Sequence, residues 1–139
     1  MRKKLAIIVD VAGTIAIRSN RGPYEWSLAH TDQPNTPIVE LVNRLASTGI
    51  RIIFISGREQ YLESLTRQWL AQFFDFEFDV LLRQNGDYRK DSIIKKELYL
   101  KHVELEYQTI AVLDDRDQVV RMWRNELGKT CLQVAEGDF

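Results

Sequence analysis

Several side chains that could bind or attack a phosphate follow the apolar runs of this sequence. A short apolar run that ends in a turn is typical of a strand buried on both faces. Parallel strands bring their carboxyl ends together at one edge of a sheet, where ligands bind. Carboxylates, a hydroxyl, a lysine and an arginine at that edge would together suit phosphate chemistry. The candidates are Asp10, Ser56, Arg58, Asp91, Lys95, Asp114 and Asp115.

Three aspartates in this set provide the hard oxygen ligands that Mg²⁺ prefers. Without a cation, neighbouring carboxylates would repel one another, and a cation would also neutralise the charge of a phosphate. Asp10 could then attack phosphorus in line and form an aspartyl-phosphate, which is hydrolysed in a second step. Simpler interpretations stay open, because Asp10 could cap the following turn and Asp114-Asp115 could be a solvated helix start.

The other candidates would bind the oxygens of the phosphate. Ser56 and Lys95 would each hold an oxygen, and Arg58 could add a bidentate clamp. These residues also have structural alternatives, since Ser56-Gly57-Arg58 could be only a turn. Lys95 could pair with Asp91, four residues earlier on the same helix face. If all of these residues meet at one sheet edge, they indicate a phosphate site much more specifically than any single residue does.

Hydrophobic periodicity predicts the elements that position these residues. Strands and helices alternate along the chain, which predicts an α/β fold with a five-stranded, mainly parallel sheet and helices on both faces. The segment 18–33 has no clear period, and we expect a loop or small flap there. The predicted strands cover 5–9, 50–55, part of 76–82, 109–113 and 130–134. The predicted helices cover 37–48, 59–74, 91–103 and 118–127.

Length, composition and charge limit the possible classes of function. The chain has 139 residues, of which 45% are hydrophobic and 28% charged, as expected of one folded domain over 1–139. Its net charge of −1 excludes a global attraction to nucleic acid or membranes, so a polyanion site must be a local basic patch. Cys131 is the one cysteine and predicts a buried, inert thiol in a reducing compartment. No stretch is long enough to span a bilayer.

The motifs together resemble those of the haloacid dehalogenase-type phosphatases. The first motif of that family, Asp-x-Asp-Gly-Thr, corresponds to residues 10–14, and its later hydroxyl, lysine and acidic motifs correspond to Ser56, Lys95 and Asp114-Asp115. The resemblance implies the three-layer, Rossmann-like fold of that family with a minimal cap. It also implies a phosphatase with Mg²⁺ as cofactor and Asp10 as nucleophile.

Further segments resemble the 3′-phosphatase domains of bacteriophage polynucleotide kinase-phosphatases, and this resemblance covers nearly the whole chain. It implies that the protein converts 3′-phosphate ends of DNA or RNA to 3′-hydroxyls, in the cytoplasm of a bacterium or a phage-infected host. Its substrates would be 3′-phosphorylated single strands and nucleoside 3′-phosphates. A kinase domain would be fused or a partner, because the chain has no Gly-x-x-x-x-Gly-Lys-Ser/Thr loop. The matching segments are 21–24, 56–59, 86–87, 89–91, 114–116, 118–120, 122–123 and 137–139.

This resemblance assigns a set of site residues. The catalytic residues would be Asp10, Ala12, Ser56 and Lys95. The substrate-binding residues would be Thr14, Arg18, Arg21, Ser56, Gly57, Arg58, Asp91 and Lys95. The metal ligands would be Asp10, Ala12, Asp114 and Asp115.

Ala12 departs from the family pattern, which has an aspartate that protonates the leaving oxygen and then activates water. Alanine can do neither, although its backbone carbonyl can still bind Mg²⁺ as the resemblance implies. Loss of a general acid–base group typically costs about a hundredfold to ten-thousandfold in rate. We therefore expect a strongly impaired enzyme. Because every other motif residue is present, we hypothesise that Ala12 is an engineered substitution in an otherwise competent site.

Basic and aromatic side chains in the predicted loops could form the rim of a nucleotide site through phosphate contacts and base stacking. The short flap predicts an open site, which suits a polymer end better than a sealed metabolite pocket. Two alternatives stay open: a small-molecule phosphatase of the same superfamily, and a catalytically silent module that binds 3′-phosphate ends. The candidate rim residues are Arg18, Arg21, Tyr24, Trp26, Arg83, Tyr88, Arg89 and Lys90.

Overall fold

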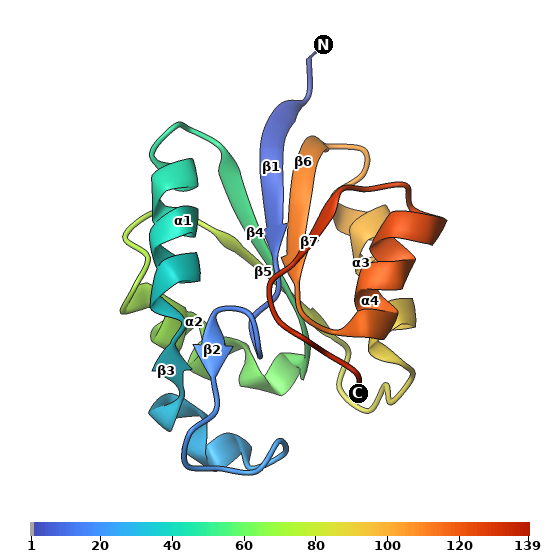
Figure 1. Ribbon diagram of the computed structural model, residues 1–139. Coiled ribbons are helices and arrows are strands. Elements are labelled where there is room, and N and C mark those ends of the chain that lie inside the picture. Colours follow the sequence, from blue (N-terminus) through green and yellow to red (C-terminus); the bar gives the residue numbers. More distant parts are fainter. Residues whose placement is uncertain (1) are drawn as a thin grey trace.

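Five parallel strands form the central sheet of the computed structural model, which describes residues 2–139 (Figure 1). The strand order is β5-β4-β1-β6-β7. The chain first builds outward from β1 to β4 and β5, and then returns to the other side of β1 with β6 and β7. The crevice where such an order reverses is where open α/β sheets bind ligands. The strands are β1 (Lys4–Val9), β4 (Arg51–Glu59), β5 (Asp79–Arg83), β6 (Tyr107–Asp114) and β7 (Cys131–Gln133).

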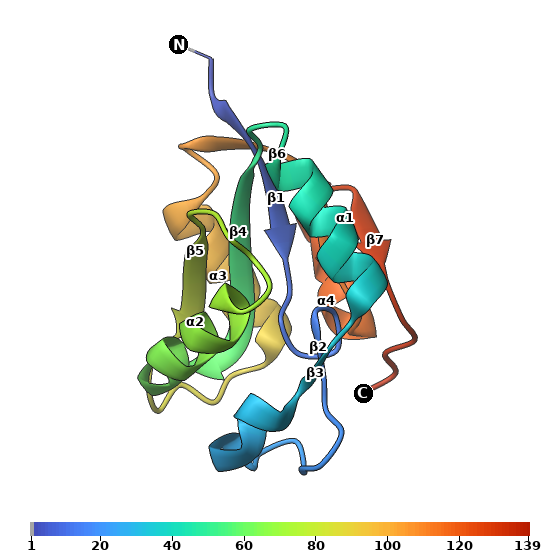
Figure 2. The ribbon, with the colours of Figure 1, turned by 90° about the vertical axis from the view of Figure 1, so that its left-hand side faces the viewer.

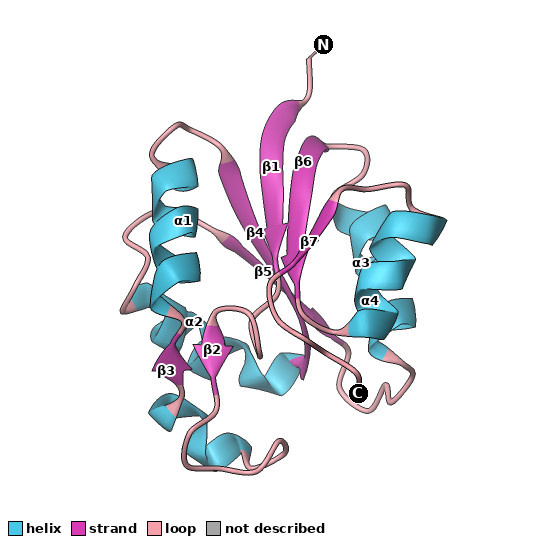
Figure 3. Ribbon diagram, viewed as in Figure 1, coloured by secondary structure: helices cyan, strands magenta, loops and turns pink. Residues whose placement is uncertain are grey.

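Helices cover both faces of the sheet and complete three layers (Figures 1 and 3). The helices α1 (Thr36–Ala46) and α2 (Glu63–Ala71) lie on one face, and α3 (Asp91–His102) and α4 (Asp117–Arg121) lie on the other. This arrangement confirms the predicted α/β fold with a five-stranded sheet.

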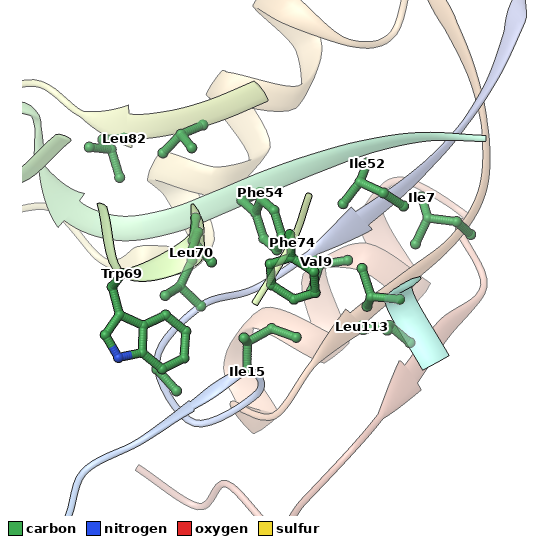
Figure 4. Close-up of a cluster of buried hydrophobic side chains, with 14 residues drawn as sticks. Ile7, Val9, Ile15, Ile52, Phe54, Trp69, Leu70, Phe74, Leu82 and Leu113 are labelled. Atoms are coloured by element: carbon green, nitrogen blue, oxygen red, sulfur yellow. The ribbon is translucent and has the colours of Figure 1, made fainter. Parts of the chain in front are cut away.

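The burial of residues 6–9 explains why this part of β1 is an unbroken apolar run. Ile7 and Val9 belong to the buried cluster under α1 and α2, which also contains Phe54 and Leu70 (Figure 4). Ala6 and Ile8 belong to the opposite cluster, under α3 and α4. Side chains alternate between the faces of a strand, so a strand between two helical layers needs apolar residues at every position.

The predicted flap is a small, ordered lobe beyond the carboxyl end of β1 (Figure 2). The short strands β2 (Ala16–Ile17) and β3 (Gln33–Pro34) pair antiparallel at its base. A 3₁₀ helix, η1 (Trp26–Thr31), lies between them. The segment 18–33 therefore contains regular structure that its sequence does not reveal.

Three predicted elements have wrong boundaries. The strand β4 extends to Glu59, whose pairing with Arg83 of β5 continues the sheet past a register shift. The predicted helix over 59–74 consequently begins only at Glu63, after a short 3₁₀ turn. The helix predicted over 118–127 is α4 followed by a π-helical turn, Met122–Glu126, that carries the fully buried Trp123.

Cys131 is buried, as predicted, with 3% of its surface exposed. Burial raises the pKa of its thiol to about 12, so the thiolate form is scarce at neutral pH. Within residues 2–139 the structure contains no helix that is both long enough and apolar enough to cross a membrane.

Candidate active site

A cavity of about 490 Å³ lies at the carboxyl edge of the sheet and gathers most of the predicted site residues. These residues come from the ends of β1, β4 and β6 and from the first turns of α3. The predicted residues that line the cavity are Asp10, Ala12, Ser56, Gly57, Arg58, Asp91, Lys95, Asp114 and Asp115.

Three predicted substrate-binding residues do not line the cavity. Thr14 is buried behind Asp10, and its hydroxyl donates a hydrogen bond to Asp10 Oδ2 at 3.0 Å. The side chain of Arg21 is buried and paired with Asp32. Arg18 is exposed on the segment that follows β2. Among the predicted rim residues, Tyr24, Trp26, Arg83, Tyr88, Arg89 and Lys90 do line the cavity.

Lys95 joins two of the three aspartates at the floor of the cavity. Its Nζ donates hydrogen bonds of 2.8 Å to Asp10 Oδ1 and of 2.8 Å to Asp114 Oδ2. All three groups are buried, with 5% or less of each residue exposed. The possible surface pair between Asp91 and Lys95 is therefore not formed, because the lysine points inward to the aspartates instead.

The electrostatics of this floor show a shortage of positive charge. Burial is the main cause that raises the pKa of Asp10 from 3.8 to about 6, and the nearby Asp115 adds to it. Burial and the charge of Asp10 likewise raise the pKa of Asp114 to about 6. Burial opposes the charged form of Lys95, but its two carboxylate partners outweigh this effect and raise its pKa.

The donor set at this floor suits a divalent metal ion. One oxygen each from Asp10, Asp114 and Asp115 lies within 4.8 Å of the others. Three carboxylates and one ammonium group leave two negative charges uncompensated, and the ligands are hard oxygens. These three residues could therefore hold a metal ion.

Divalent cation binding should strengthen as the pH rises through 6. Between pH 4 and 6 the folded, metal-free protein holds protons on Asp10 and Asp114 that the unfolded chain has lost, because the folded pKa values are raised to about 6. Its stability therefore falls as the pH rises through this window. A cation must displace these protons, so the increase in Tm caused by Mg²⁺ should grow from pH 5 to pH 7.5. An increase in Tm that is independent of pH would contradict this assignment.

Gly13 allows the turn after β1 to pass close to Asp115. Its φ is 85°, a left-handed conformation that glycine adopts without steric cost. A Cβ at this position would also overlap the carboxylate of Asp115. The glycine of the first motif is thus required both by the backbone and by the neighbouring metal-ligand candidate.

Two buried guanidinium groups on the other side of the cavity share a single carboxylate. Arg21 donates to both oxygens of Asp32 at 2.8 Å, and Arg58 Nη2 lies 3.5 Å from Asp32 Oδ2. The ring of Trp26 lies 5.0 Å and 5.1 Å from the two guanidinium carbons. Burial lowers the pKa of Arg58 to about 10, so this group stays charged at neutral pH. One surplus positive charge therefore faces the cavity and favours an anion there.

The end of β4 leaves two hydrogen-bonding groups available at the cavity. Arg58 Nε is buried and has no hydrogen-bond partner among residues 2–139. The hydroxyl of Ser56 accepts the backbone N–H of Arg58 at 3.2 Å, which leaves its own hydrogen to be donated. Both groups are suited to the oxygens of a phosphate.

Asp91 lines another side of the cavity and is held there by two arginines. It accepts hydrogen bonds from Arg83 and, at 2.8 Å, from Arg116. Arg83 also donates to the carbonyl oxygens of Gly57 at 2.5 Å and of Asp87 and Arg89 at 2.8 Å. Arg83 thereby fixes the turn between β5 and α3 against the end of β4.

Several residues at this site were not predicted from the sequence. Asp32 lies in a segment without a period, so the sequence contains no signal for it. Arg116 directly follows the acidic pair and could have been found by its position. Phe139 lines the cavity from the far end of the chain, and only the structure reveals that placement.

The comparisons with known proteins identify the family of this site. The family described as "Polynucleotide kinase PNKP phosphatase domain" matches residues 4–139. The chain belongs to this family. The predicted resemblance to haloacid dehalogenase-type phosphatases is thereby confirmed, and the chain is a phosphatase domain by descent.

Relatives of this PNKP phosphatase domain include longer proteins. A protein of Autographa californica nuclear polyhedrosis virus, named "Putative bifunctional polynucleotide kinase/RNA ligase", is 34% identical over 123 residues, which cover 86% of this chain and 18% of that protein. The chain also matches chains in the solved structures of a Pnkp1/Rnl/Hen1 complex and of the Pnkp1/Rnl/Hen1 RNA repair complex. The identities are 41% and 42%, and the TM-scores are 0.92 and 0.91.

Each of these two matches covers 99% of this PNKP phosphatase domain, but only 48% and 44% of the other chain. The chain therefore spans less than half the length of these relatives. The class C acid phosphatase from Bacillus anthracis, solved with tungstate bound, has a TM-score of 0.64 at 18% identity. That match covers 86% of this chain and 54% of the other, and it shows a shared fold.

Proposed function

We propose that this domain is built as a Mg²⁺-dependent polynucleotide 3′-phosphatase that acts through an aspartyl-phosphate on Asp10. The observation that carries the proposal is that Asp10, part of an acidic floor that suits a divalent cation, lines the same cavity as Arg58, whose pairing with Arg21 and Asp32 leaves surplus positive charge. Membership of the PNKP phosphatase family supports the choice of a polynucleotide end as substrate.

The residues of the floor prepare Asp10 for attack. Lys95 and Thr14 each hold one of its carboxylate oxygens, which fixes the orientation of the group. With a pKa of about 6, most of Asp10 is ionised at neutral pH and is available as a nucleophile. Ser56 and Arg58 would bind the phosphate oxygens from the opposite wall. Mg²⁺ held by Asp10, Asp114, Asp115 and the Ala12 carbonyl would supply the positive charge that allows a carboxylate to approach a phosphate.

The reaction has two displacements at phosphorus. In the first, an Asp10 oxygen bonds to phosphorus, the bond from phosphorus to the 3′-oxygen breaks, and that oxygen takes a proton to become the 3′-hydroxyl. In the second, water attacks the aspartyl-phosphate, loses a proton, and releases Asp10 and inorganic phosphate. Ala12 offers no group to donate or accept these protons, so we infer that this form is strongly impaired and that Ala12 is an engineered residue.

The wider setting that we propose is nucleic acid end repair. Relatives include a protein named for polynucleotide kinase and RNA ligase activities and chains solved in an RNA repair complex. By extension, residues 1–139 would act as one phosphatase domain beside a kinase, either fused to it or bound as a partner. RNA and DNA ends are both accommodated by this proposal.

A panel of phosphorylated substrates tests the function. The Ala12→Asp variant, with Mg²⁺, should release phosphate from a 3′-phosphorylated oligonucleotide and from a nucleoside 3′-monophosphate faster than from the 5′-phosphorylated oligonucleotide or ribose 5-phosphate. Adding Asp10→Asn to this variant should abolish the release. Faster hydrolysis of the sugar phosphate would favour a small-molecule phosphatase. Binding of 3′-phosphate ends without any turnover would favour a silent binding module.

A further inference from the structure

We propose that Phe139 is the stacking surface for the base of the nucleotide that carries the 3′-phosphate. This inference rests on the proposed function and names a base-binding subsite for it. Phe139 lines the same cavity as Asp10, yet 65% of it is exposed.

The segment that carries Phe139 is docked on the acidic loop after β6. Val134 N donates to Asp114 O at 3.1 Å, and Asp117 N donates to Gly137 O at 2.8 Å. At Gly137 the two backbones are so close that a Cβ would overlap the carbonyl oxygen of Asp115. The segment 134–139 is therefore held against the metal-ligand candidates, and it delivers Phe139 to the mouth of the cavity.

Arg116 fixes the ring itself. Its guanidinium carbon lies over the ring of Phe139, 5.1 Å from the centroid, and its Nε donates to Phe139 O at 2.9 Å. The same guanidinium is anchored by its bond to Asp91 in the cavity wall. A ring that is held in place while most of its residue stays exposed is preorganised for a ligand, because little conformational entropy is lost on binding.

The size and chemistry of the cavity suit a nucleotide. Its volume of about 490 Å³ lies within the range of about 300–1,000 Å³ that is typical of sites for organic ligands. Proteins that bind single strands combine a positively charged groove with aromatic rings on which bases stack. A base beside Phe139 would continue the stack that begins with the Arg116 guanidinium.

Two other exposed aromatic residues, Tyr24 and Tyr88, also line the cavity, and each is 84% exposed. Neither ring makes a hydrogen bond, an aromatic contact or a cation–π contact with any of residues 2–139. Phe139 is thus the anchored ring among the three. Stacking of this kind tolerates any base, so we infer weak base preference.

The test compares two ligands that differ only in the base. The chain as it stands, with Ala12 and Mg²⁺, is titrated with adenosine 3′-monophosphate and with ribose 3-phosphate. Phe139→Ala should weaken binding of the nucleotide about tenfold and leave binding of ribose 3-phosphate unchanged. Phe139→Trp should retain the affinity for the nucleotide, whereas Phe139→Leu should lose it. Tyr61→Ala, which removes an exposed aromatic residue away from this cavity, is the matched control and should change neither affinity.

The outcomes separate the two proposals. If Phe139→Ala lowers the affinity for both ligands equally, or lowers neither affinity, the base subsite is overturned. The proposed 3′-phosphate site is not affected by that outcome. Failure of both ligands to bind the parent chain would overturn the proposed function, and the subsite with it. Full retention of nucleotide affinity in Phe139→Leu would also exclude stacking.

Discussion

Replacing Ala12 with aspartate is expected to raise the rate of 3′-phosphate hydrolysis by about a hundredfold to ten-thousandfold. Ala12 lines the cavity two residues after Asp10, in a turn that is fixed by the bonds of 2.9 Å from Gly13 N to Ala16 O and from Ala16 N to Val11 O. An aspartate there would face the leaving oxygen, protonate it, and then take a proton from the attacking water. The measurement is phosphate release from a 3′-phosphorylated oligonucleotide.

Ala12→Asn is the matched control for this gain. Asparagine has the size of aspartate and can donate hydrogen bonds, but it cannot exchange a proton at neutral pH. We therefore expect no gain from it. Equal rates for the Asp and Asn variants would mean that general acid–base catalysis at position 12 is not what limits the parent chain. The added carboxylate should also weaken binding of the phosphate in the Asp variant, because it repels the dianion.

Replacing Lys95 with methionine is expected to destabilise the metal-free protein by about 3–5 kcal/mol, the range for removing one partner of a buried ion pair. The change leaves Asp10 and Asp114 buried without the ammonium group that contacts both. At low pH the two carboxyls can protonate and relieve their repulsion, so the loss should grow from pH 5 to pH 8. Chemical denaturation across this range measures the effect, and Mg²⁺ should restore part of the lost stability.

Lys96→Met is the control for Lys95→Met, because Lys96 lies next along the same helix. Its partner is Glu126 at 3.0 Å, and the two side chains are 37% and 54% exposed. Exposed pairs of this kind contribute about 1 kcal/mol or less, so the stability should change little. Equal losses for the two methionine variants would contradict the idea that Lys95 compensates a buried acidic cluster.

The floor of the site could be predicted because its parts are marked in the sequence. The apolar runs 5–9 of β1 and 110–113 of β6 become buried toward their carboxyl ends, and Asp10 and Asp114 lie where those runs end. Parallel topology then brings the two ends together. Lys95 could be placed there because its helix begins on the same side of the sheet. The positions of these residues follow from local patterns, namely apolar runs and the polar residues that end them, and a sequence shows such patterns directly.

Arg58 and Arg83 were predicted at the site, but the contacts that fix the arginine walls could not be predicted, because these contacts join single charged residues far apart in the chain. Nothing in the sequence indicates that Arg21 turns inward to Asp32, or that Arg116 reaches Asp91. The extension of β4 to Glu59 could not be predicted for a related reason. Its last residues are polar, and only pairing with β5 keeps them extended.

Asp115 lies between two glycines from opposite ends of the described chain. Gly13 approaches its side chain and Gly137 approaches its backbone, and neither approach leaves room for a Cβ. Opening of the segment 134–139 would therefore loosen Asp115, a candidate ligand of a cation. By thermodynamic linkage, a cation held by Asp10, Asp114 and Asp115 would in turn protect that segment from opening. Slower amide hydrogen exchange in 134–139 would then report occupancy of a site to which this segment contributes none of the candidate ligands.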